Sequence, residues 1–179
     1  MGIRTRVTKT LALCSVVLLV ACGSSDQSSS TLTGTDVTNL PPGNATGTAF
    51  SGKYLLKDGK ITECECRVNE CSKWNVSRGD TFTFTETDGS LHVLLHSITN
   101  TMGAMDQMYD GGINRGGDFR VGSTFVRQDG TFYGLLSGTM VPGVSADVES
   151  HTTAKGQVAG EDFDCDLVLN ATLSYLSTP

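Results

Sequence analysis

Hydrophobic and polar residues alternate in short runs from Ala49 to the C-terminus. In the run Thr81–Thr85, two phenylalanines occupy one face and three threonines the other, which is typical of a half-buried strand. The run Cys165–Tyr175 repeats this pattern, with Cys, Leu, Ala and Tyr at alternate positions. No segment shows a sustained helical period. The pattern predicts an all-β domain over residues 49–179.

Turn signals divide this domain. Asp-Gly pairs at 58–59, 88–89, 110–111 and 129–130 separate candidate strands, and Asp-Gly readily adopts the backbone conformation of tight hairpins. We predict an antiparallel meander of about eight strands, at residues 49–56, 60–67, 81–86, 91–99, 119–127, 131–141, 150–158 and 164–176. Closing such a meander into an up-and-down barrel removes its exposed edges, so a barrel is favoured. A two-sheet β-sandwich is the alternative.

The N-terminus has the order of a secretory signal, because Arg4, Arg6 and Lys9 precede the apolar run Leu11–Val20. That run is shorter than the roughly 20 residues of a membrane-spanning helix. The following Leu19-Val20-Ala21-Cys22 resembles the lipobox of bacterial lipoproteins. The resemblance implies cleavage after residue 21 and a lipid anchor on Cys22. The alternative is an ordinary signal-peptidase site at which Cys22 is incidental.

The composition and charge of the chain indicate where the domain lies and argue against nucleic acid as a partner. Residues 22–48 are rich in Ser, Thr, Gly, Asn and Pro, which predicts a disordered tether behind the lipidated cysteine. Gly23 rather than Asp follows Cys22, which by analogy with enteric bacteria predicts the outer membrane of the cell envelope. Cleavage leaves 10 Lys and Arg against 19 Asp and Glu, a formal net charge of −9. Such a chain is not expected to bind nucleic acid.

The hairpin meander and the motif Gly52-Lys53-Tyr54 resemble the small barrels of the lipocalin-like and avidin-like proteins. Lipocalins usually carry Gly-x-Trp at this point, whereas here the third residue is tyrosine and Trp74 lies elsewhere. The resemblance implies a cup that binds a small apolar or amphipathic molecule.

Four cysteines remain after Cys14 and Cys22, namely Cys64, Cys66, Cys71 and Cys165. An even number in an exported domain predicts two disulfides. Cys64 and Cys66 share a strand face and are not expected to bond to each other. One of them therefore closes the loop to Cys71, and the other reaches Cys165 and fastens the barrel. A thiolate zinc site is the alternative.

Two further stretches could bind metals. Thioethers and imidazoles suit copper in an oxidising envelope, and the candidates are Met102, Met105, Met108, His92 and His96. Residues 92 and 96 lie roughly 13 Å apart along a strand, too far to chelate one ion. The glycine-rich stretch 109–118 has the oxygen-rich look of a calcium loop but fits no calcium motif, so we predict a flexible hairpin loop.

No nucleophile elbow, zinc-protease motif, P-loop or dinucleotide-binding glycine motif occurs in the chain. We expect a non-catalytic, membrane-anchored lipoprotein without a cofactor, whose barrel binds a small amphipathic ligand or an envelope component. The alternatives are an inhibitor or surface-assembly protein that uses its outer surface, and a copper-handling protein.

Overall fold

The structure is a computed structural model that describes residues 31–66, 79–97, 105–158 and 160–179; of Met105 and Val158 only the backbone is described. These residues form one short helix and eight strands. They are α1 (Gly34–Val37), β1 (Gly52–Cys66), β2 (Thr81–Thr87), β3 (Ser90–Ser97), β4 (Met105–Ile113), β5 (Asp118–Val126), β6 (Gly130–Val141), β7 (Ser145–Val158) and β8 (Glu161–Ser177).

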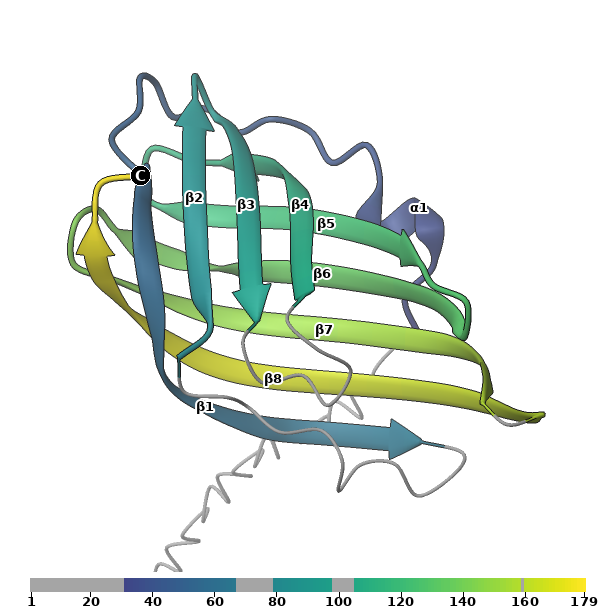
Figure 1. The fold of residues 1–179 in the computed structure, drawn as a ribbon. Helices are drawn as coiled ribbons and strands as arrows, with labels where there is room; N and C mark the ends of the chain where they lie inside the picture. Colours follow the sequence, from purple (N-terminus) through teal and green to yellow (C-terminus); the bar gives the residue numbers. More distant parts are fainter. Residues whose placement is uncertain (1–30, 67–78, 98–104, 159) are drawn as a thin grey trace, which may run out of the picture.

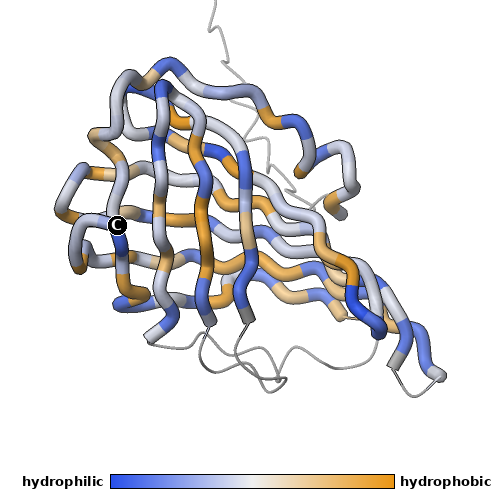
Figure 2. Tube along the Cα trace, turned by 45° about the horizontal axis from the view of Figure 1, so that its top comes forward, coloured by the Kyte–Doolittle hydropathy of each residue, from blue (hydrophilic) through white to orange (hydrophobic). Residues whose placement is uncertain are grey.

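The eight strands form a closed barrel in which each strand pairs with the next and β8 pairs with β1. Every pairing is antiparallel. The prediction of an up-and-down barrel is therefore confirmed, and the alternative β-sandwich is wrong. Hydrophobic and hydrophilic positions alternate along the strands, as expected when one face of a sheet is buried (Figure 2).

The barrel is continuous at one end only. β1 pairs with β2 over just Gly52–Leu55, and β4 pairs with β5 over just Asp110–Ile113. By contrast, β1 pairs with β8 from Lys53 to Cys66. The strands β1 and β6–β8, of 12 to 17 residues, therefore extend beyond the short strands β2–β4 (Figure 1). We call the region where all eight strands pair the closed end, and the region beyond it the splayed end.

Two of the four predicted Asp-Gly turns, at 58–59 and 110–111, lie inside strands instead. Asp58-Gly59 lies inside β1, which is a single strand rather than the predicted two, with register shifts at Leu56/Asp58 and Ile61/Glu63. Asp88-Gly89 does form the β2–β3 turn, with φ angles of 48° and 82°. Asp129-Gly130 lies in the β5–β6 turn, where Arg127 and Gly130 exchange backbone hydrogen bonds. Asp58-Gly59 can lie within a strand because a β-bulge places an extra residue in one strand without ending the ladder.

The glycine-rich stretch predicted as a flexible loop is mostly strand. Asp110-Gly111 lies inside β4, a strand missing from the prediction, and only residues 114–117 connect β4 to β5. Gly112 has a packing reason: a Cβ there would lie 2.3 Å from the backbone nitrogen of Gly43. The glycines that suggested a loop are therefore in a strand, and at Gly112 a second segment passes close to the backbone.

That second segment is residues 31–50, which we call the strap. The sequence predicts a disordered tether here, but the strap packs along the barrel. Leu32, Val37 and Phe50 are buried, and the backbone N–H groups of Gly43 and Ala45 donate to the carbonyls of Gly89 and Ile113. The average composition is polar, but a few apolar side chains and backbone hydrogen bonds are enough to dock the strap.

Aromatic side chains fill the interior of the closed end. Tyr54 and Phe84 are fully buried, with ring centroids 5.3 Å apart in an edge-on arrangement. Phe84 makes a second edge-on contact with Phe119 at 5.6 Å. Tyr54, from the motif that resembles the lipocalin signature, also contacts Tyr175. Seventeen buried residues make up this core, so the closed end is a packed interior rather than an empty cup.

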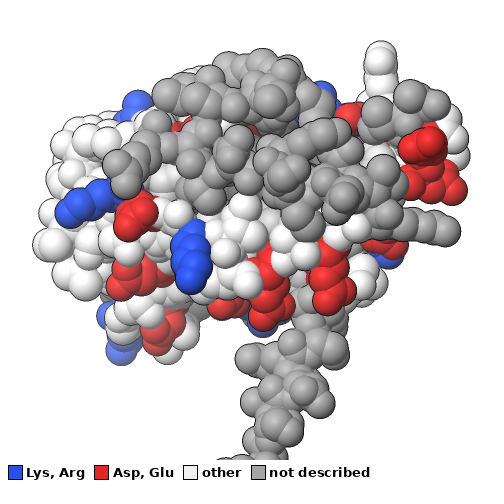
Figure 3. Space-filling model, turned by 90° about the horizontal axis from the view of Figure 1, so that it is seen from below, with Lys and Arg blue, Asp and Glu red and all other residues white. Residues whose placement is uncertain are grey.

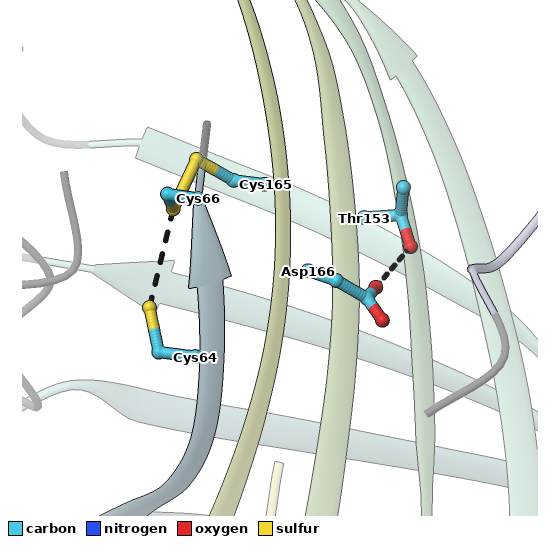
Figure 4. Close-up of a disulfide and its surroundings, with 5 residues drawn as sticks. All are labelled: Cys64, Cys66, Thr153, Cys165 and Asp166. Atoms are coloured by element: carbon cyan, nitrogen blue, oxygen red, sulfur yellow. Dashed lines mark hydrogen bonds between the residues drawn. A yellow bond between two sulfur atoms is a disulfide. The ribbon is translucent and has the colours of Figure 1, made fainter. Parts of the chain in front are cut away.

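The splayed end has a much smaller core. Phe132 stacks on Phe125 with centroids 4.6 Å apart and lies 6.4 Å from Phe163. Beside them Cys66 and Cys165, which face each other across β1 and β8, form a disulfide (Figure 4). Covalent closure therefore supplements a thin apolar cluster at this end.

Candidate functional site

A slit between β4 and β5 is the candidate site. Beyond Asp110 and Gly122 these two strands no longer pair, and a hollow of about 470 Å³ opens between them. Its lining residues are Asp106, Gln107 and Met108 from β4, and Ser123, Thr124, Phe125 and Arg127 from β5 and the residue after its end. This volume lies within the usual range of small-molecule sites.

The slit connects the outside of the barrel with its interior. Met108 and Thr124 are exposed on the outer face, whereas Ser123 is buried and Phe125 belongs to the inner aromatic cluster. Because side chains alternate between the two faces of a strand, one row of lining residues points outward and the next inward. A molecule in the slit would therefore contact both solvent-exposed and interior side chains.

The inner wall of the slit is polar toward β4 and aromatic toward the splayed end. Gln107 hydrogen-bonds to the hydroxyl of Tyr109, and both side chains lie against Gly134 across the barrel. Burial raises the pKa of Tyr109 well above its ordinary value of 10.0. Tyr109 is thus a neutral hydroxyl at the inner edge of the site.

Arg127 is the basic residue of the slit lining. Its Nε lies 3.4 Å from Oδ1 of Asp129, so its charge is compensated locally. Both side chains remain about a quarter exposed, at 27 and 26%.

The predicted disulfide cysteines are partly described. Cys66 is bonded to Cys165, as one of the predicted arrangements requires. Cys64 is also disulfide-bonded, and its Sγ lies 3.9 Å from that of Cys66 (Figure 4). Cys71 lies outside the described residues, and so do Cys22 and the signal segment.

The candidate copper ligands are only partly brought together. His92, His96 and Met108 share the outer face of β3 and β4, whereas Met102 lies outside the described residues and only the backbone of Met105 is described. Within the described part of the chain, no group of three or more His, Cys, Asp and Glu side chains is arranged around one ion.

A buried polar cluster was not foreseen from the sequence. Thr153 donates to Oδ1 of Asp166 at 2.5 Å (Figure 4). Nε2 of His151 lies 2.9 Å from the same oxygen. The hydroxyl of Thr153 accepts the backbone N–H of Leu32 at 2.9 Å. Asp166 is only 8% exposed. This cluster fixes the start of the strap to β7 and β8.

The slit was also missed, although one signal was present. Ser123 and Arg127 fall on the same strand face as Phe119, Val121 and Phe125, so two polar residues interrupt an apolar face. Such an interruption indicates that this part of the strand face is no longer packed in the apolar core. The sequence could not place the opposite wall, because that depends on where β4 stops pairing with β5.

The surface charge follows the composition. Viewed from below, acidic side chains are spread over the described part of the face, with scattered basic ones between them (Figure 3). Among the described residues, no helix has the length and apolarity needed to cross a membrane.

Comparison with known proteins adds no family. A scan of protein-family models, a search of curated proteins and a search of solved structures each find no match to this chain. The barrel architecture is compatible with a lipocalin-like fold, and function must be argued from the site itself.

Proposed function

We propose that this protein is a non-catalytic envelope lipoprotein that binds a small amphipathic molecule in the slit between β4 and β5. The observation that carries the proposal is the hollow of about 470 Å³ at the point where the two strands separate. Since the closed end is filled by its own aromatic core, the ligand site is the slit rather than a central cup.

The lining supports an amphipathic ligand. Phe125 is stacked on Phe132, and the pair offers an apolar wall continuous with the splayed end. Gln107 supplies an amide group from β4, and Ser123 supplies a hydroxyl group beside Phe125 on the same face of β5. Binding sites of this kind use apolar walls for affinity and a few polar groups for orientation. A chain of methylenes would lie along the phenylalanines, with its polar end toward Gln107 and Ser123.

The lipid anchor on Cys22 remains part of the proposal. Because the strap docks from Leu32 onward, only nine residues separate Cys22 from the docked strap. Fully extended, nine residues span at most about 32 Å. The domain would therefore lie close to the lipid headgroups, where amphipathic molecules are concentrated.

Native mass spectrometry tests this proposal. We would purify the oxidised protein from the envelope of its own host, together with the variant Ser123→Trp, which fills the slit. Ser174→Trp is the matched control, because Ser174 lies on the outer face of β8. We expect a bound lipid-sized mass on the wild type and the control and none on Ser123→Trp.

An unliganded wild-type protein, or equal retention by all three proteins, would contradict binding in the slit. The first result would favour the alternative in which the outer surface binds a protein partner. An ester or amide cleaved on incubation with the protein would contradict the non-catalytic part.

A further inference from the structure

The outer face of β3 and β4 carries two matched imidazole–carboxylate pairs. In the register of these strands His92 faces Asp110, Leu94 faces Met108, and His96 faces Asp106. Both histidines and both aspartates are about half exposed or more, and the apolar pair Leu94–Met108 lies between them. The same two side-chain types therefore occur twice on one open surface.

The carboxylates bind the same nitrogen of each ring. Nδ1 of His92 contacts Oδ1 of Asp110, and Nδ1 of His96 lies 2.5 Å from Oδ1 of Asp106. A neutral imidazole that donates its Nδ1–H to a carboxylate carries a lone pair on Nε2. Metal-binding histidines characteristically have this arrangement, because the carboxylate fixes the tautomer and increases the basicity of the ligating nitrogen.

His151 provides an internal contrast. Its Nε2, rather than Nδ1, contacts Asp166 at 2.9 Å, and its side chain is only 15% exposed. It also lies beside the buried Thr153 under the strap. The ligating nitrogen that is open in His92 and His96 is therefore occupied in His151.

One ion cannot join the two exposed histidines. They are four residues apart on a strand, which separates their Cα atoms by about 13 Å. Each pair must therefore act as a separate site. Met108 lies diagonally from both rings and is 60% exposed, so its thioether can approach either site. Imidazole nitrogen binds copper as well as zinc, iron and nickel, thioether sulfur favours Cu(I), and Cu²⁺ stands highest in the affinity order of divalent ions.

We propose that His92 and His96 form two separate surface sites for a copper-class transition-metal ion, each binding through Nε2, with Asp110 and Asp106 as positioning residues. The sites share Asp106 and Met108 with the lining of the slit. Ser123 is buried on the inner face, away from both imidazoles, so a protein with Ser123→Trp should bind the same number of ions as the wild type.

Copper titration tests the proposal. The full-length protein is stripped with EDTA and titrated with Cu²⁺ by isothermal calorimetry, while NMR records paramagnetic broadening of the histidine rings. We expect two ions per chain and broadening of the His92 and His96 rings but not of His151. His92→Ala and His96→Ala should each remove one ion, and His151→Gln should remove none.

The positioning role has its own readout. Asp110→Asn should weaken the His92 site by about 10- to 100-fold and leave the His96 site unchanged. Circular dichroism checks that each variant is folded. Two ions retained by the double variant His92→Ala/His96→Ala, loss of copper in His151→Gln, or no copper binding by the folded wild type would each overturn the proposal.

Discussion

At the closed end, Tyr54, Phe84 and their neighbours fill the barrel with side chains that are almost entirely inaccessible to solvent. At the splayed end, three phenylalanines and the Cys66–Cys165 disulfide hold long strands that have lost their short partners. The same alternating sequence pattern produces both regions. They differ in where the ladders stop, and the slit opens where the β4–β5 ladder ends. Packing therefore stabilises the closed end, whereas the splayed end combines the disulfide with the slit that we propose as the ligand site.

The largest expected effect comes from removing the covalent closure of the splayed end. The double substitution Cys66→Ser/Cys165→Ser opens a link between residues 99 apart. The loop-entropy relation predicts a loss of about 4–5 kcal/mol in the free energy of unfolding. Urea unfolding followed by circular dichroism measures it. A loss below about 1 kcal/mol would show that packing alone holds this end.

Truncating the closed-end core should cost slightly less. Phe84 is fully buried and contacts Tyr54 and Phe119, so Phe84→Ala should lower the free energy of unfolding by about 3–5 kcal/mol. Phe125→Ala at the splayed end is the matched control, and its effect should be less than half as large because Phe125 is only partly buried. Equal losses in thermal or urea unfolding would remove the distinction between the two ends.

The docked strap allows a smaller and more local test. A methyl group at Gly112 would lie 2.3 Å from the nitrogen of Gly43, so Gly112→Ala should displace the strap and cost about 1–3 kcal/mol. The amides of Gly43 and Ala45 should then exchange faster with solvent deuterium. Gly116→Ala is the control, since its added carbon meets nothing closer than 3.6 Å. Unchanged exchange in Gly112→Ala would mean that the strap does not need this close approach.

The smallest expected effect is on the free energy of unfolding at alkaline pH. Burial raises the pKa of Tyr109 above its ordinary value of 10.0, so the folded state favours the neutral phenol. Its contribution to stability is fully present below that ordinary value and is lost as the pH rises above it. Tyr109→Phe should therefore flatten the decline in the free energy of unfolding above the ordinary pKa, as measured by urea titrations at successive pH values. Parallel declines in the two proteins would contradict this reading.

Features that depend on neighbouring residues could be predicted from the sequence, whereas features that depend on contacts between distant segments could not. Alternation identified the faces of β2 and β8, because each strand shows its buried side locally. Asp58-Gly59 and Asp110-Gly111 misled because a bulge or a close-packed segment elsewhere decides whether such a pair turns. The strap was not predicted because its average composition is polar, although the apolar side chains of Leu32, Val37 and Phe50 are buried. The slit depends on non-local ladder lengths, and only Ser123 and Arg127 hinted at it.

The most direct test of the ligand slit is an amide NMR titration of the protein with decanoate, an amphipathic probe with one polar end. We expect saturable shifts at Gln107, Ser123 and Phe125, their loss in Ser123→Trp, and their retention in Ser174→Trp. Shifts centred on the closed-end core or on the outer faces of β6–β8, or no saturable shift at all, would contradict it.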